Sequence, residues 1–303
     1  MPEFDLIIPV AKQDLNTALA NIRYIQDNLK PSKIVIITAE EVRRTFDKCA
    51  SGDRDVVIID ESSMIPNLTF HNVKKYMDKR GAGKRTGWYF QQFLKMAYAF
   101  ICDKEYYMSW DADTIPIRNH SMFEGDIPLF CTKKEYNKPY FDTLKKMLGM
   151  DKVIEDSFIA EHMMFNKQVM LELIQDLTKC GNKLWFYNIL DSIADDALGQ
   201  AGFSEFETYG TYAVTKYPNM YRFREVSAIR NAKRIFDVCP KHEVVHWLAK
   251  DYDTLSFEKW DKHIVHNSIY NNALFRTVCP PHVYIKICYG IIKLRHKLSG
   301  EDK

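Results

Sequence analysis

The sequence predicts an α/β protein with a mostly parallel sheet flanked by helices, and three observations favour this fold class. The first half alternates short apolar runs with amphipathic stretches, which is the pattern of successive β-α-β units. The apolar runs are continuous, as expected of strands that are buried on both faces of a sheet. At 303 residues, of which 46% are hydrophobic, the chain is long enough to bury a substantial core.

Each predicted element rests on its own residue pattern. Runs of β-branched and other apolar residues predict strands at 4–10, 33–38, 55–60 and 105–110. Apolar residues at helical spacing predict helices at 14–29, 40–48 and 88–101. The second half is less regular, and its patterns predict helices at 136–148, 167–179, 186–198 and 256–276 and strands at 127–131 and 243–248. No clear linker divides the chain, so we expect one domain.

Composition narrows the class of protein further. A net charge of only +2 gives no reason to expect nucleic acid as a partner. The seven cysteines include no Cys-x-x-Cys pair and mostly lie in apolar runs, so we expect reduced, buried thiols. We find neither a signal-peptide pattern at the N-terminus nor a stretch of about 18 apolar residues. These features predict a cytoplasmic protein that contacts a membrane at most peripherally.

One acidic motif stands where a site would be expected. Asp111 and Asp113 directly follow the predicted strand 105–110, and ligands of α/β sheets collect at the carboxyl ends of strands. Two carboxylates one residue apart can face the same hard cation, such as Mg²⁺ or Mn²⁺. The same Asp-x-Asp spacing occurs twice more in this chain, so an ordinary solvated turn is the alternative interpretation.

Five segments together resemble a known group of enzymes. The run GWYFQQFLK at 87–95 precedes WDADT at 110–114, and AEHM at 160–163, SEFETYG at 204–210 and SFE at 256–258 follow. This set, over about residues 4–270, resembles bacterial GT-A-like glycosyltransferases of surface-polysaccharide (capsule and O-antigen) loci. The resemblance implies a nucleotide-sugar donor, a divalent metal held by the Asp-x-Asp motif, and a glycan or lipid-linked acceptor. It also implies a nucleotide-binding half at 1–115 and an acceptor half at 116–281.

The resemblance also suggests which residues contact the donor nucleotide. Arg85 and Lys95 are cations suited to phosphate, although either could be an ordinary surface charge. Trp88 could stack on a base or a sugar, or simply fill the core. The full set of expected nucleotide contacts is Pro9, Val10, Asp60, Arg85, Trp88, Gln92, Lys95, Asp111 and Ala112.

Acidic residues in the second half are candidates for catalysis. Glu205 and Glu207 begin a predicted helix, where an inverting enzyme could place the base that deprotonates the acceptor hydroxyl. Ser204 with Glu207 also forms a capping box, which alone could explain Glu207. Glu161 and His162 are candidates for contact with donor or acceptor sugar, and His266 is the expected third metal ligand, after Asp111 and Asp113.

Three rival interpretations remain. His242, Glu243 and His246 match the HExxH pattern of zinc hydrolases, which needs a helix. Pro240 and the paired valines favour a strand there, which would hold the histidines about 13 Å apart. A haloacid-type phosphatase fits less well, because Ile115 occupies the place of the motif's Thr or Val. The third alternative is a non-catalytic sugar-binding protein on the same fold.

The C-terminal residues 282–303 predict a basic amphipathic helix. Tyr284, Ile287, Cys288, Ile291, Leu294 and Leu298 share one predicted helical face, with lysines on another. Such a helix could lie through 284–298 on an anionic inner membrane leaflet, or dock on the protein's own core.

Overall fold

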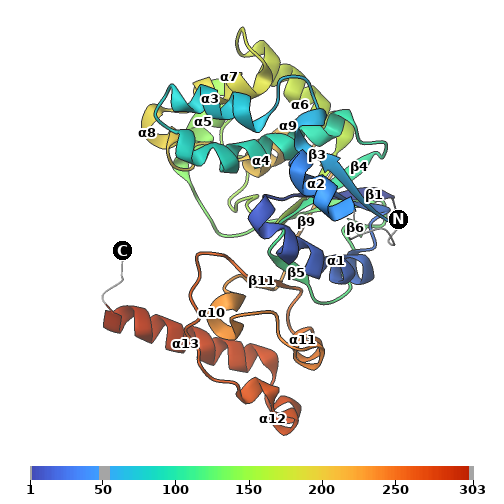
Figure 1. Cartoon of the computed structure of the whole chain (residues 1–303), viewed down its shortest axis with the longest axis vertical. Coiled ribbons are helices and arrows are strands. Elements are labelled where there is room, and N and C mark those ends of the chain that lie inside the picture. Colours follow the sequence, from blue (N-terminus) through green and yellow to red (C-terminus); the bar gives the residue numbers. More distant parts are fainter. Residues whose placement is uncertain (1, 48–54, 300–303) are drawn as a thin grey trace. The chain divides into compact units, whose positions relative to one another are not determined.

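A computed structural model describes residues 2–47 and 55–299 of the chain (Figure 1). The chain forms two compact units, and each unit is assembled from separate segments. Unit 1 comprises Met1–Leu19, Pro31–Ala112 and Met122–Glu225, and unit 2 comprises Ala20–Lys30, Asp113–Ser121 and Val226–Lys303. Residues of the expected acceptor half, 116–281, therefore contribute to both units.

Unit 1 is built on a five-stranded sheet with the strand order β3-β2-β1-β4-β8. The strands are β1 (Phe4–Pro9), β2 (Lys33–Thr38), β3 (Val56–Asp60), β4 (Tyr106–Trp110) and β8 (His162–Asn166). The first four are parallel, and β8 pairs antiparallel with β4. This arrangement confirms the predicted α/β class with a mostly parallel sheet. Strand order reverses between β1 and β4, which makes their carboxyl ends the switch point of the sheet.

Continuous apolar strands are buried on both faces, as the sequence indicated. Ile7, Val35 and Tyr107 belong to the main core of unit 1, while the alternate residues Leu6 and Ile34 are equally buried. The main core is completed by side chains from several helices, among them α4 (Thr86–Ala97), α6 (Lys167–Lys179) and α9 (Glu205–Lys216). Figure 1 shows these three helices gathered on one side of the sheet.

The remaining elements of unit 1 are shorter. Its other helices are α2 (Glu40–Asp47), α3 (Phe70–Asp78), α5 (Lys138–Leu148), α7 (Trp185–Ser192) and α8 (Asp195–Leu198). Short 3₁₀ turns occur at Lys12–Asp14, Glu61–Ser63, Gly83–Arg85 and Tyr98–Phe100. A small second sheet joins β6 (Phe123–Glu124), β7 (Ile127–Cys131) and β9 (Arg222–Arg224).

Unit 2 has its own sheet and core. Its sheet contains β10 (Ala228–Ile229), β11 (Thr254–Ser256) and β5 (Thr114–Pro116), in that order. Its helices are α10 (Ala232–Phe236), α11 (His242–Leu248), α12 (Ala273–Val278) and α13 (Pro281–Ser299), with a 3₁₀ turn at Ile269–Asn271. Helix α1 (Leu15–Leu29) begins in unit 1 and ends in unit 2. Within the described ranges, no helix is both long and apolar enough to cross a membrane.

Two predicted elements of the second half are wrong. The predicted strand 243–248 is helix α11, because Val244, Val245 and Leu248 form a helical face buried in the unit 2 core. The predicted helix 256–276 is β11 followed by an irregular segment, the 3₁₀ turn and short α12. The polar run Asn267-Ser268 disfavours a helix at this point. Helix α12 begins only at Ala273, where the side chain of the capping residue Asn272 accepts a hydrogen bond from the Phe275 amide.

Candidate active site

The candidate site lies in unit 1 at the carboxyl ends of β1 and β4. Ile7 of β1 is opposite Ser109 of β4, so both strands end at the same edge of the sheet. Asp111 follows β4 at this edge, and its backbone amide donates to the Glu161 carbonyl at 2.9 Å. Because β8 runs antiparallel to β4, its first residues also lie at this edge. The structure therefore brings Asp111, Glu161 and His162 together, although 50 residues separate them along the chain.

Lys95 occupies the centre of the site. Its Nζ lies 3.3 Å from Asp111 Oδ1 and 3.0 Å from Glu205 Oε1. The Lys95 side chain is only 12% exposed, and that of Glu205 is 6% exposed, whereas that of Asp111 is 42% exposed. Burial alone would lower the pKa of Lys95, but the charges of Glu205 and Asp111 raise it above its usual value. Lys95 is therefore a fixed cation, which excludes the interpretation of an ordinary surface charge.

The two candidate catalytic acids have different surroundings. Glu205 is the first residue of α9, and its backbone amide donates to Gln92 Oε1 at 3.0 Å. Ser204 caps the helix by accepting the Glu207 amide at 3.2 Å. The Glu207 carboxylate accepts a hydrogen bond from the Ser157 hydroxyl, and burial raises the pKa of Glu207. Of the pair, only Glu205 bonds to Lys95.

One face of α4 and the preceding turn carries four of the predicted residues. Arg85, Trp88, Gln92 and Lys95 recur at spacings of three, four and three residues, so they lie on one helical face. Arg85 lies over the Trp88 ring at 4.7 Å and donates to the Gln200 carbonyl. The half-buried Trp88 stacks on Tyr140 with ring centroids 6.4 Å apart. This face presents a partly open aromatic surface next to a buried cation.

The Glu161-His162 pair is buried and already engaged within the protein. Glu161 forms an ion pair with Lys133. The His162 ring stacks on Trp110 at 4.8 Å, and its Nε2 lies 3.1 Å from Cys131 Sγ. These contacts fix both side chains beside the strand end. The pair would therefore contribute to the site mainly through its fixed charge and shape.

The remaining nucleotide candidates have local structural partners. Pro9 ends β1, and the Val10 amide donates to the Ile37 carbonyl at 2.8 Å. Asp60 caps the turn after β3 by accepting the Ser62 amide at 3.1 Å. The adjacent Glu61 is half-buried, and burial together with the negative charge of Asp60 raises its pKa to about 7.

The metal candidates divide between the two units. Asp111 and Ala112 end a segment of unit 1, while Asp113 begins a segment of unit 2. There the Asp113 carbonyl accepts the amide of Phe257 at 2.9 Å. His266 is exposed in an irregular segment, not on the predicted helix, with its ring 4.7 Å from that of His263. Over residues 2–47 and 55–299, no three His, Cys, Asp or Glu side chains are grouped closely enough to hold an ion.

Three residues of the site escaped the sequence reasoning. Lys133 pairs with Glu161, Tyr140 stacks on Trp88, and Ser157 bonds to Glu207. Lys133 follows the predicted strand 127–131, so its position at a strand end was a usable signal. Tyr140 and Ser157 reach the site only through tertiary packing, which no local pattern reveals.

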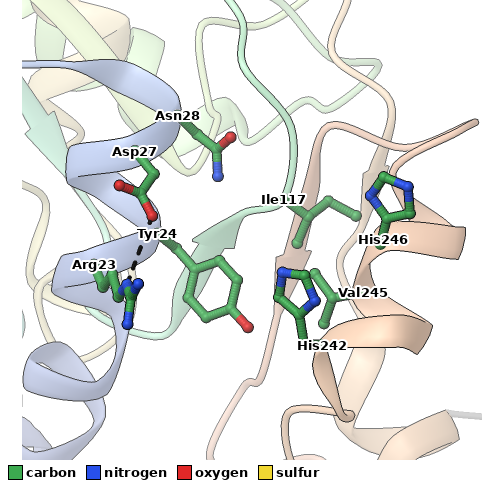
Figure 2. Close-up of a pocket in the computed structure, with 8 residues that line it drawn as sticks. All are labelled: Arg23, Tyr24, Asp27, Asn28, Ile117, His242, Val245 and His246. Carbon is green, nitrogen blue, oxygen red and sulfur yellow. Dashed lines mark ion pairs between the residues drawn. The ribbon is translucent and has the colours of Figure 1, made fainter.

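The HExxH segment is helical, which corrects the strand argued from its sequence. His242 and His246 lie one turn apart on α11 and line a cavity of about 440 Å³ within unit 2 (Figure 2). Arg23, Tyr24, Asp27, Asn28, Ile117 and Val245 complete the lining. As Figure 2 shows, α1 residues face the two histidines across the cavity.

A mostly parallel sheet flanked by helices, with the Lys95, Asp111 and Glu205 cluster at its switch point, defines an α/β protein. The chain belongs to a protein family described as a "family of unknown function (DUF6492)", which matches residues 16–279. No curated protein matches the sequence.

Solved structures of several transferases are similar to this chain at low identity. Mouse xyloside xylosyltransferase 1 is 10% identical, with 85% of this chain and 98% of that chain covered and a TM-score of 0.45. The glycosyltransferase GlyE of Streptococcus pneumoniae TIGR4 is 10% identical, with 95% and 63% covered and a TM-score of 0.44. The galactosyltransferase LgtC, in complex with donor and acceptor sugar analogs, is 10% identical, with 90% and 94% covered and a TM-score of 0.38. Similarity at this level does not transfer an activity to this chain.

Proposed function

We propose that the protein is a metal-dependent glycosyltransferase that moves a sugar from a nucleotide-sugar donor to a glycan or lipid-linked acceptor. The observation that carries this proposal is the buried Lys95, ion-paired with Asp111 and Glu205 at the switch point of the sheet. Nucleotides bind at this edge of open α/β sheets. A fixed cation there suits the diphosphate of a nucleotide sugar, because phosphate oxygens pair strongly with buried positive charge.

The carboxylate of Asp111 fits a hard divalent cation. It is the most exposed carboxylate of the Lys95 cluster, and oxygen ligands suit Mn²⁺ or Mg²⁺. Asp113 is the second proposed ligand because of its spacing in the sequence. When bound, the ion would neutralise charge on the departing diphosphate.

The other residues of the site have distinct proposed roles. Lys95 supplies a permanent positive charge next to Glu205, and the Glu205 carboxylate accepts the proton of an acceptor hydroxyl. Trp88, which is half-buried, stacks on the base or on a sugar. Glu161 and His162 shape the wall next to Asp111. A base at Glu205 favours inversion at the anomeric carbon, which the configuration of the product tests directly.

The resemblance in sequence extends the proposal to a cellular role. On this basis we propose that the enzyme acts in the assembly of a surface polysaccharide, in the cytoplasm, on an acceptor at the inner face of the cell membrane. Which sugar is moved depends on side chains that line the donor pocket.

Nucleotide binding gives a direct test that needs no knowledge of the acceptor. We expect at least one nucleoside diphosphate to raise the melting temperature in the presence of Mn²⁺, because a ligand of the folded state stabilises it by mass action. Asp111→Asn should abolish the shift, while the surface variant Asp142→Asn should keep it. Equal shifts in the two variants, or no shift with any nucleotide, would refute the proposed site. Release of nucleotide from a donor without acceptor would separate a transferase from a non-catalytic sugar-binding protein.

A zinc hydrolase is the second candidate function, and the helical conformation of α11 favours it. The helix places His242 and His246 on one face, as two ligands of one ion require, with Glu243 next to them. The third protein ligand is missing from the described residues. Zinc that co-purifies in equimolar amount, is lost in His246→Ala and accompanies peptide hydrolysis would favour this candidate over the transferase.

A further inference from the structure

The C-terminal part of unit 2 has a pronounced charge bias. Between Asp261 and Glu301 the sequence contains no acidic residue. The same interval carries six basic residues, which are Lys262, Arg276, Lys286, Lys293, Arg295 and Lys297. A chain with a net charge of only +2 therefore concentrates positive charge in one segment.

Helix α13 packs on the unit 2 core through one side only. Tyr284, Ile285, Cys288 and Ile292 are buried in that core, each at most 7% exposed. The apolar face predicted from the sequence is therefore divided into two parts. Tyr284 and Cys288 pack on the core, whereas Ile287, Leu294 and Leu298 are exposed. Docking on the core therefore holds only for the side that carries Tyr284 and Cys288.

The outer side of α13 carries a stripe of exposed apolar side chains. The stripe consists of Val283, Ile287, Leu294 and Leu298, which are 39%, 56%, 59% and 78% exposed. At 100° per residue they fall within a sector of about 60°, which lies roughly 120° around the helix from the buried side and is about 24 Å long. Lys286, Lys293 and Lys297 occupy the adjacent sector, and all three are exposed. On α12, Leu274 and Val278 are likewise about 80% exposed, one turn apart.

We propose that unit 2 docks peripherally on a membrane surface rich in anionic lipid headgroups through this stripe of α13. An apolar stripe bordered by lysines suits such a surface, since the side chains enter the headgroup boundary while the lysines pair with phosphates. A second copy of the chain is a poorer occupant. A two-fold dimer offers the lysine rows no opposite charge, and in its antiparallel form it places both rows on the same side of the helix pair, whereas anionic headgroups neutralise them. The inference is independent of the proposed reaction, because it rests on unit 2 alone.

Vesicle binding by the full chain tests the proposal. Removing residues 282–303 is unsuitable, because four of them complete the core. We expect the protein to sediment with vesicles of phosphatidylcholine containing phosphatidylglycerol and not with pure phosphatidylcholine. Ile287→Ser with Leu294→Ser and Leu298→Ser should abolish binding. Changing the three lysines to Gln should weaken it about a hundredfold, since each contributes roughly fivefold near an anionic surface.

Controls on unit 1 make the result specific. Val153→Ser with Phe223→Ser removes apolar side chains that are 47% and 52% exposed, and it should leave vesicle binding unchanged. Circular dichroism should show that all variants keep the wild-type helix content. Wild-type failure to bind anionic vesicles, or undiminished binding by the Ser triple variant, would overturn the proposal. So would a wild-type dimer in sedimentation equilibrium that the Ser triple variant dissociates.

Discussion

Lys95 Nζ lies 3.0 Å from Glu205 Oε1, and this contact joins the last turn of α4 to the first turn of α9. Both side chains are almost fully buried, and Asp111 is the second carboxylate that pairs with Lys95. Buried charges of this kind are tolerated only when they are paired. The pair therefore links the packing of two helices to the electrostatics of the proposed site.

Replacing Lys95 by Met should destabilise the protein by about 3–5 kcal/mol, because Glu205 would remain charged and buried without its partner. Urea unfolding measures this free energy. The surface pair Lys138 and Asp142 provides the control, since Lys138→Met should cost less than about 1 kcal/mol. Adding Glu205→Gln to Lys95→Met should recover part of the loss. A Lys95→Met variant as stable as Lys138→Met would contradict the buried pair.

Glu205→Gln should lower kcat of sugar transfer by at least about a hundredfold, because the amide cannot accept the hydroxyl proton. Nucleotide binding in the presence of Mn²⁺ should persist, which thermal shift can verify. Glu207→Gln should change kcat much less, since the Glu207 carboxylate bonds to Ser157 rather than Lys95. Loss of kcat in Glu207→Gln together with an active Glu205→Gln would reverse the assignment.

Glu61 should make stability fall as the pH rises. Its pKa is raised from 4.5 to about 7 in the folded state, with burial as the main cause, so the unfolded chain loses this proton first. Between about pH 4.5 and pH 7, ionisation therefore favours unfolding, by roughly 2 kcal/mol after screening. Urea unfolding at both ends of this window should show a smaller decline for Glu61→Gln than for the wild type.

Glu40 offers the matched control for this measurement. Hydrogen bonds from Arg43 and Arg44 lower the pKa of Glu40 to about 2, so Glu40 is ionised across the window in the folded state, and above about pH 5.5 it is ionised in the unfolded chain as well. Above that pH, Glu40→Gln should therefore leave the decline of stability with pH as it is in the wild type. A Glu61→Gln variant that declines as steeply as Glu40→Gln would show that Glu61 is not the responsible group.

Two glycines should respond in opposite ways to substitution by Ala. At Gly210 in α9, a Cβ atom would lie 2.4 Å from Cγ of the buried Phe158 ring, so Gly210→Ala should cost about 1–3 kcal/mol. At Gly290 in α13, nothing lies within 4 Å of an added Cβ, so Gly290→Ala should stabilise by up to about 1 kcal/mol. Thermal unfolding distinguishes the two. A neutral Gly210→Ala would show that α9 can shift away from Phe158.

The sequence predicted the first half of the fold well, because buried parallel strands and amphipathic helices have distinct local patterns. Strand β2 and helix α6 have the predicted bounds. Helix α11 was mistaken for a strand, since β-branched Val244 and Val245 favour strands locally while their burial in the unit 2 core favours the helix. Tertiary packing therefore decides between strand and helix at this segment.

The candidate site, like the fold, could be predicted from the sequence only in part. The position of Asp111 at a strand end follows from the local pattern of β4, and Lys95 follows from the apolar periodicity of α4. Neither pattern shows that Lys95 and Glu205 form an ion pair, because that contact depends on how α4 packs against α9. The engagement of Glu207 by Ser157 is likewise a product of long-range packing.

The antiparallel strand β8 has a consequence for how the site can diversify. Chain that leaves the sheet after β4 and chain that enters it before β8 meet at one edge, where the Asp111 amide donates to the Glu161 carbonyl, so the stretch that leads into β8 ends next to Asp111. Insertions, deletions or exchanges in that stretch can reshape the pocket while the β4 and β8 pairing holds its register. Relatives with different sugar preferences should therefore differ most in this stretch and least in the two strands that bracket it.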